Sequence, residues 1–364
     1  MIDQSSIHVS TGDQHKADVR MRLKYMPVSF FAAVLGLTGA TIAWQRAERL
    51  LALPFAISGV ALILSLAAFL SIATIYALKA ARHFDAVKRE FAHPVKINFF
   101  PTISISLLLF SIAFLRLNHD ISRYVWIAGA VAHLALTIAI LSAWMQRSTL
   151  QIQHINPAWF IPVVGNIIVP IAGVDHAPAE VSWFFFSFGL IFWIALFTLV
   201  LYRLIFHQPP LPERLIPTLF IMMAPPAIGF ISYVKLMEHA ISGFELDSFA
   251  RILYYVGLFL FMPLLVQYRQ FVKIPFYLSW WAYSFPTAAI TIATVLMAAK
   301  TGLLFFHALA YILLVALAAL IFLLLVRTFS AIINKKVFVE GIEELNNVSQ
   351  SSESFLKRRI YIIQ

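Results

Sequence analysis

The sequence contains no cysteine among its 364 residues. Disulfide bonds, thiolate metal sites and cysteine nucleophiles are therefore excluded. Charge is also scarce, because charged residues make up 12% of the chain and hydrophobic residues 61%. That balance is typical of membrane proteins and leaves no room for a separate soluble domain.

The common signatures of catalysis are missing as well. The sequence has no paired-histidine metal motif and no nucleophile elbow, so we expect no enzyme, no metal site and no cofactor. A formal net charge of +10 would favour nucleic acid if it formed a basic face on a folded domain. The basic residues lie between apolar runs instead, so we expect no nucleic-acid partner.

Apolar runs of about 20 residues or more, the length that crosses a bilayer as a helix, alternate with short charged clusters. They predict an all-α integral membrane protein with ten transmembrane helices. The expected spans are 26–45, 51–78, 98–115, 122–145, 158–174, 180–202, 215–234, 249–268, 275–299 and 302–327.

Lysine and arginine predict the orientation of these spans. Of the 27 basic residues, 20 fall on the side of the two chain ends and 7 on the other, which places both termini in the cytoplasm. We expect a disordered cytoplasmic N-terminal tail at 1–25, one ten-helix membrane domain at 26–330 and a cytoplasmic C-terminal tail at 331–364. The C-terminal tail has basic residues beside apolar ones, a pattern that suits either a solvated tail or an anionic membrane surface.

Prolines mark an internal repeat. Spans one, three, five, seven and nine each carry one at a corresponding place, with separations of 74, 61, 63 and 61 residues: Pro27, Pro101, Pro162, Pro225 and Pro286. The repeat unit is a helical hairpin of about 60 residues, used five times.

These prolines predict which spans face inward. Proline inside a helix removes one N–H, kinks the helix and leaves a carbonyl without its usual partner. In a bilayer, such backbone is tolerated only where protein or a water-filled cavity covers it. We therefore expect the odd-numbered spans to surround a central pore that the prolines shape, and the even-numbered spans to face lipid or neighbouring helices.

The middle of the expected spans contains no carboxylate, which argues against a proton-coupled pump or a cation site. A neutral, constricted tube suits a small anion better. His133 and His307 lie on even-numbered spans, where we expect them to be packed or interfacial. Phe31, Asn166 and Ser284 are candidates for lining the pore, although Asn166 suits a bridge between two helices equally well.

The stretch WWAYSFPTAAITIAT, residues 280–294, places Phe285 directly before Pro286. Pro286 cannot donate to the carbonyl of Ala282, so the helix is expected to bend there. The ring of Phe285 then projects into the pore as a plug, since hydrophobic constrictions close pores by excluding water.

Four segments carry a family resemblance. They are MPVSFFAAVLGLTGATIAW (26–44), EFAHPVKINFFPTISI (90–105), NPAWFIPVVGNIIVP (156–170) and the stretch at 280–294. In these segments the chain resembles the tellurite-resistance and dicarboxylate-transporter family, which includes bacterial TehA and the plant slow-type anion channels. The similarity runs from about residue 26 to 330.

The resemblance implies a channel of five tandem hairpins in a ring, assembled as a homotrimer with one pore per subunit, that passes small monovalent anions such as chloride and nitrate. It also implies that Phe285 is the pore gate, because Trp281, Ala282, Tyr283, Ser284 and Phe285 match the family pattern. The chain departs from the bacterial pattern at Pro286, where glycine is expected. The alternative is a secondary carrier or exporter of dicarboxylates or related oxyanions. We expect it in a bacterial inner membrane, surrounded by lipid.

Overall fold

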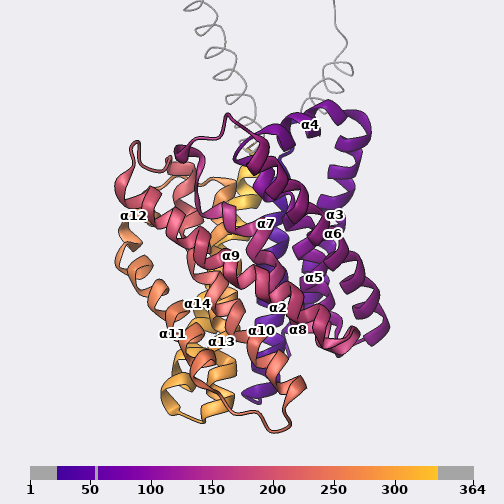
Figure 1. The fold of residues 1–364 in the computed structure, drawn as a ribbon, viewed down its shortest axis with the longest axis vertical. Coiled ribbons are helices and arrows are strands. Elements are labelled where there is room, and N and C mark those ends of the chain that lie inside the picture. Colours follow the sequence, from indigo (N-terminus) through magenta and orange to yellow (C-terminus); the bar gives the residue numbers. More distant parts are fainter. Residues whose placement is uncertain (1–22, 54–55, 335–364) are drawn as a thin grey trace, which may run out of the picture.

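The structure, a computed structural model, describes residues 23–53 and 56–334 (Figure 1). Within these ranges ten helices are long and apolar enough to cross a membrane, and no β-strand occurs. The all-α fold class and the ten spans predicted from the sequence are therefore confirmed. The expected tails at 1–25 and 331–364 lie outside the described residues, apart from 23–25 and 331–334.

The odd-numbered spans, here called the inner spans, are each built from a 3-10 segment followed by α-helix. The first joins η1 (Val28–Phe30) to α2 (Phe31–Leu50), and the second joins η2 (Lys96–Phe99) to α5 (Pro101–Phe114). The third consists of η4 (Pro157–Trp159), α7 (Phe160–Val164), η5 (Gly165–Ile168) and α8 (Pro170–His176). The fourth joins η6 (Glu213–Met223) to α10 (Ala224–Ala240), and the fifth joins η7 (Leu278–Tyr283) to α13 (Ser284–Thr301).

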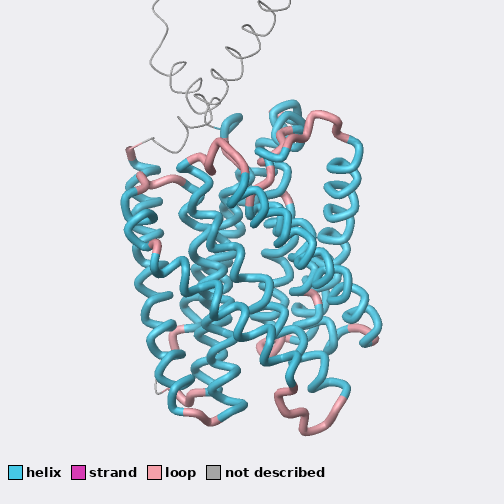
Figure 2. Tube along the Cα trace, turned by 60° about the vertical axis from the view of Figure 1, so that its left-hand side comes forward, coloured by secondary structure: helices cyan, strands magenta, loops and turns pink. Residues whose placement is uncertain are grey.

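The even-numbered spans, here called the outer spans, are single α-helices: α3 (Ser58–Arg82), α6 (His119–Gln146), α9 (Ala179–Phe206), α11 (Ser248–Val266) and α14 (Leu304–Ile333). The short helices α4 (Phe84–Ala92), α12 (Tyr268–Lys273) and η3 (Ile152–His154) lie in connections. Figure 2 shows that the long helices run side by side and are joined by loops at the two ends of the bundle. The labels in Figure 1 place α4 and α12 at the same end, which we call the proximal end; the opposite end is the distal end.

The inner spans close into a ring. Along it α2 packs against α5, α5 against η5 and α8, these against α10, α10 against α13, and α13 against α2. Each outer span packs against the inner span that precedes it in its hairpin: α3 on α2, α6 on α5, α9 on α7, η5 and α8, α11 on α10 and α14 on α13. The fold is therefore five tandem hairpins in two concentric shells.

Burial confirms the predicted sorting of the spans. In an 18-residue apolar stretch of each span, between 72% and 94% of the residues are buried in the inner spans, whereas between 17% and 33% are buried in the outer spans. The exposed large apolar side chains of the outer spans, such as Phe184 and Phe259, point away from the bundle and suit contact with lipid.

The repeat prolines act differently from the expected kinks inside continuous helices. Pro101 is the first residue of α5, Pro225 the second of α10, and Pro162 and Pro286 are the third residues of α7 and α13. N–H groups in the first turn of a helix have no acceptor inside that helix, so a proline there loses no hydrogen bond. Four of the five prolines thus mark where 3-10 helix changes to α-helix, while Pro27 lies just ahead of η1. Ala282, whose carbonyl Pro286 was expected to leave unpaired, belongs to the 3-10 segment η7.

Two glycines let α2 approach α13. A Cβ added at Gly36 would lie 2.6 Å from Cβ of Ser284, and one at Gly39 would lie 3.0 Å from Cβ of Ala288. Small residues permit this kind of close backbone packing between membrane helices. The contact closes the ring between its first and last members.

The second span begins at Ser58, later than the residue 51 predicted from hydropathy. The chain turns first, and Ala52 there has a φ of 50°. Glu48 then satisfies the free donors at the start of α3, because its Oε1 accepts from the N–H groups of Ile57 at 2.6 Å and Ser58 at 2.8 Å. A carboxylate ten residues upstream thereby acts as a helix cap.

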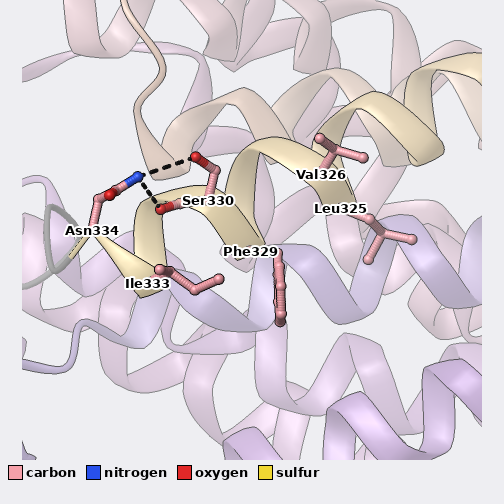
Figure 3. A pocket seen from close by; sticks show the side chains of 6 residues that line it. All are labelled: Leu325, Val326, Phe329, Ser330, Ile333 and Asn334. Carbon is pink, nitrogen blue, oxygen red and sulfur yellow. Dashed lines mark hydrogen bonds between the residues drawn. The ribbon is translucent and has the colours of Figure 1, made fainter.

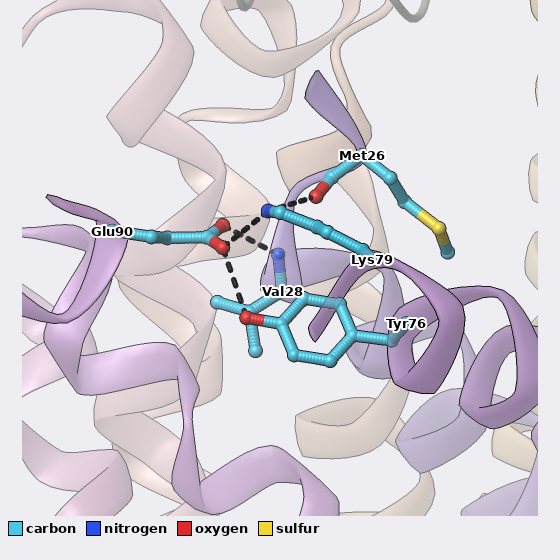
Figure 4. A network of polar contacts seen from close by, with 5 residues as sticks. All are labelled: Met26, Val28, Tyr76, Lys79 and Glu90. Carbon is cyan, nitrogen blue, oxygen red and sulfur yellow. Dashed lines mark hydrogen bonds and ion pairs between the residues drawn. The ribbon is translucent and has the colours of Figure 1, made fainter. Parts of the chain in front are cut away.

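A buried ion pair holds the start of the first inner span at the proximal end (Figure 4). Nζ of Lys79 in α3 lies 2.6 Å from Oε2 of Glu90 in α4 and donates to the carbonyl of Met26 at 2.6 Å. The carboxylate of Glu90 also accepts from the N–H of Val28 at 2.7 Å and the hydroxyl of Tyr76 at 2.9 Å. Both members of the pair are less than a tenth exposed, so α3, α4 and η1 are tied together away from water.

Candidate functional site

A small cavity lies at the centre of the ring of inner spans. It has a volume of about 70 Å³, well below the roughly 300 Å³ at which pockets for drug-sized ligands begin. All five inner spans contribute to its lining. The lining residues are Ala32, Leu35, Phe99, Thr102, Ile105, Phe160, Ile161, Val164, Gly165, Ile168, Ile221, Ala224, Pro225, Ile228, Trp281, Ala282, Phe285 and Pro286.

This lining carries no charge. Its one hydroxyl, that of Thr102, donates to the carbonyl of Phe99 at 2.5 Å, so its proton is already engaged. Such a site has no side chain that could bind a cation or hold a substrate carboxylate tightly. It combines a narrow apolar constriction with the absence of strong binding groups, which is the chemistry of a hydrophobic barrier to ions.

Phe285 is the least buried of the aromatic residues that line this cavity. Four aromatic residues line the cavity, and Phe99, Phe160 and Trp281 are all buried, at 9%, 1% and 1% exposure. Phe285 is only half-buried, although its neighbours Ser284 and Pro286 are fully covered. Its ring is backed by α2, since a Cβ added at Gly39 would lie 3.2 Å from Cδ2 of the ring.

The other predicted lining residues lie elsewhere. The ring of Phe31 contacts those of Phe69 and Tyr76 in α3, with centroids 6.2 Å and 5.9 Å away. Ser284 faces Gly36 of α2 and donates to the carbonyl of Trp281 at 2.6 Å.

Asn166 joins two spans. Its amide nitrogen donates to Oγ1 of Thr137 in α6 at 2.9 Å and to the carbonyl of Val163 at 2.8 Å. This is the helix-bridging arrangement that the sequence also allowed. Neither Asn166 nor Phe31 nor Ser284 is among the residues that line the cavity.

The repeat prolines mark the level of the cavity along the inner spans. In the last four inner spans, every lining residue lies within six positions of the repeat proline, and Pro225 and Pro286 line it themselves. Pro27, Pro101 and Pro162 are not in the lining. Phe99, Phe160 and Ile221 line the cavity but were not predicted from the sequence. Their short distance along the chain from a repeat proline is the signal that could have identified them.

The histidines at depth are packed away from the cavity. His133 is fully buried, and its Nδ1 lies 2.9 Å from Oγ of Ser104 in α5. Its ring also fills the space beside Gly165, where an added Cβ would lie 2.6 Å from Nε2. His307 lies on the outer span α14. Neither histidine is among the lining residues.

A second hollow lies on the surface of the bundle and takes no part in this site. It is lined by the end of α14 and by the residue that follows it: Leu325, Val326, Phe329, Ser330, Ile333 and Asn334 (Figure 3). The side chains of Val326, Phe329 and Ile333 are at least half exposed, as expected for an outer helix in contact with lipid.

Comparison with known proteins gives a consistent set of relatives. A family described as voltage-dependent anion channel matches residues 25–329. The S-type anion channel SLAH3 of Arabidopsis thaliana is 31% identical over 280 residues, which cover 75% of this chain and 43% of SLAH3. The uncharacterized transporter MJ0762 of Methanocaldococcus jannaschii is 25% identical over 292 residues, 75% of this chain and 84% of its own length.

A third relative is the tellurite resistance protein TehA homolog of Haemophilus influenzae. It is 25% identical over 267 residues, which cover 73% of this chain and 79% of the homolog. The chain spans about half the length of the plant S-type channels that it matches.

Proposed function

Because this chain belongs to the voltage-dependent anion channel family, we propose that it is an integral membrane channel that passes small monovalent anions such as chloride and nitrate. The observation that carries the proposal is a closed ring of five inner spans around a narrow cavity without charge. An anion that binds weakly in such a bore also leaves it quickly, as conduction requires.

We further propose that Phe285 is the gate. Two features of Phe285 support this proposal. Its ring is half-buried and lines the cavity, and the residue lies at the 3-10 to α junction, directly before Pro286. In the closed state the ring fills the bore and keeps out water, and a rotation of this one side chain reopens the path. Pro101, Pro162, Pro225 and Pro286 shape the bore by setting the depth of these junctions, and Pro27 contributes by setting the start of the first inner span.

The ion dependence of the current tests the channel proposal. In liposomes or planar bilayers holding the purified protein, we expect currents that reverse at the chloride or nitrate equilibrium potential and do not respond to a pH gradient. The competing function is a carrier or exporter of dicarboxylates or related oxyanions, suggested by the name of the family resembled. Labelled succinate that exchanges across the membrane without any chloride or nitrate current would reject the channel and favour the carrier.

Gly39 allows a test of the gate from behind the ring. A methyl group in Gly39→Ala would lie 3.2 Å from the Phe285 ring and 3.0 Å from Ala288, which removes the room that the ring needs to swing toward α2. We expect a several-fold smaller current from this variant than from the parent. In the Phe285→Ala background the same change should have little effect, because the ring is gone. An equal loss in both backgrounds would show that Gly39 acts through helix packing alone.

The surroundings of the channel are proposals of the same kind. The 20 to 7 division of basic residues supports cytoplasmic termini, with residues 26–330 as the channel and 1–25 and 331–364 as cytoplasmic tails. The relative from the bacterium Haemophilus influenzae supports a bacterial inner membrane, with lipid around the outer spans. A homotrimer with one pore per subunit follows from the resemblance of the sequence to channels of this build. Cross-linking of the protein in membranes checks the trimer.

A further inference from the structure

The distal ends of the five inner spans all carry charged side chains. We call these seven residues the distal ring: Arg46 and Arg49 in α2, Arg116 just after α5, Asp175 in α8, Lys235 and Glu238 in α10, and Lys300 in α13. The distal ring contains five cations and two carboxylates, a net charge of +3. Glu48, also at this end, turns its carboxylate to the start of α3.

Both carboxylates of the distal ring are already paired. Nζ of Lys235 lies 3.1 Å from Oδ2 of Asp175, and Nζ of Lys300 lies 2.6 Å from Oε1 of Glu238. Each lysine thus neutralises one acid. Among the residues that the structure describes, no carboxylate is within 4.0 Å of a guanidinium nitrogen of Arg46, Arg49 or Arg116. Three arginine charges therefore remain for another anion.

Arg46 lies on the face of α2 that lines the bore. It follows Leu35, which lines the cavity, by eleven residues of one continuous helix. Eleven residues of α-helix make three full turns plus only about 20°. Arg46 therefore lies on the same face of α2 as Leu35, about 16 Å closer to the distal end. Its charge interacts with groups on other inner spans as well as its own, namely Arg116, Asp175 and Glu238. These charges on other inner spans agree with a place for Arg46 on the side of α2 that faces the centre of the ring.

The backbone at Arg46 is held in place by the residue before it. Its neighbour Gln45 donates from Nε2 to the carbonyl of Ala113 in α5 at 3.1 Å, which holds the distal ends of α2 and α5 together. Arg46 itself is partly buried, whereas Arg49 and Arg116 are exposed. A partly buried guanidinium is less screened than a surface charge and offers several N–H donors to an anion.

We propose that Arg46, assisted by Arg49 and Arg116, forms a binding site for a small inorganic anion at the distal mouth of the bore. The inference rests on the proposed function, because it makes this site the place where the permeant ion is collected before it meets the apolar constriction. A pore mouth lined by charges of one sign raises the local concentration of ions of the opposite sign. The arginines at the distal mouth thereby compensate for the absence of charge inside the bore.

The first test measures conduction in the Phe285→Ala background, with nitrate replaced by gluconate at constant ionic strength. We expect Arg46→Gln to raise the nitrate concentration for half-maximal conductance by about three- to tenfold. Arg46→Lys, which keeps the charge, should stay within about twofold of the background. The matched control is Arg251→Gln, which removes an exposed cation at the same end from the outer span α11.

Glu238→Gln tests the sign of the effect. It frees Lys300 and makes the distal ring more positive, so it should lower the half-maximal nitrate concentration. A gain of this kind does not arise from misfolding. If Arg46→Gln and Arg251→Gln both match the background, and Glu238→Gln does not lower the value, the site is overturned.

The second test is independent of conduction. Nitrate should raise the thermal unfolding midpoint of the parent protein in detergent, and Arg46→Gln should abolish that rise while Arg251→Gln keeps it. If Phe285→Ala carries no current but nitrate still stabilises the parent through Arg46, the channel proposal fails and the anion site stands. If Phe285→Ala conducts and Arg46→Gln leaves both readouts unchanged, the anion site fails and the channel stands.

Discussion

Replacing Phe285 by alanine is expected to raise the anion conductance of the reconstituted protein by at least about tenfold, which corresponds to a barrier lower by about 1.4 kcal/mol. The ring is the half-buried aromatic group in a cavity of about 70 Å³. Without it the narrowest part of the bore can hold water, so an anion no longer has to shed its hydration shell there. Single-channel and macroscopic currents in planar bilayers, at equal amounts of protein, measure the effect.

The control for this experiment is Phe259→Ala. Phe259 lies on the outer span α11 and is 63% exposed, so its loss removes the same ring without touching the bore. We expect parental currents from this variant. Small and equal currents from the parent, Phe285→Ala and Phe259→Ala would remove Phe285 from the role of gate.

Replacing Glu90 by glutamine is expected to lower the free energy of unfolding by about 3–5 kcal/mol, because it leaves the ammonium of Lys79 buried without its carboxylate. Lys79 is 3% exposed and has the carbonyl of Met26 as its other oxygen partner. Val28 and Tyr76 donate to different oxygens of the Glu90 carboxylate, and glutamine keeps an acceptor oxygen for one of them, so the loss reports on the charge together with one hydrogen bond. Unfolding in mixed micelles, followed by far-ultraviolet circular dichroism, measures it.

Two further variants separate charge burial from simple loss of a contact. The double variant Lys79→Met, Glu90→Gln should recover most of the stability, since it leaves no buried charge unpaired. Lys235→Met breaks the ion pair between Lys235 and Asp175, in which the two side chains are 27% and 34% exposed. This change should lower the free energy of unfolding by less than about 1 kcal/mol. A double variant as unstable as Glu90→Gln alone would show that the hydrogen-bond geometry dominates.

The arrangement of the spans could be predicted from the sequence because two signals repeat along the chain. Basic clusters separate the apolar runs, and one proline recurs in every second run. Together they fix the number of helices and which of them face inward. The start of α3 could not be predicted, because its cap is Glu48, a residue on the preceding span that reaches Ser58 only in the folded chain. The role of Glu90 was missed for the same reason.

The sequence could predict the level of the candidate site along the spans, but not which side chains point into it. Phe285 lines the cavity at the level that Pro286 marks. Phe31 and Ser284 are each one residue from a lining residue, yet one residue on a helix turns the side chain by about 100°, away from the bore. The repeat gives the level of a side chain along the span, and only packing between neighbouring spans, such as Gly36 against Ser284, decides where it points.

The division into two shells has a consequence for how the protein responds to bilayers of different thickness. The outer helix α14 has 30 residues and is about 45 Å long, more than the roughly 30 Å of a typical hydrocarbon layer. Mismatch of this kind is relieved by tilting the helices that touch the acyl chains. The inner spans are mostly covered by protein, so the diameter of the conducting path is insulated from the lipid composition of the host membrane.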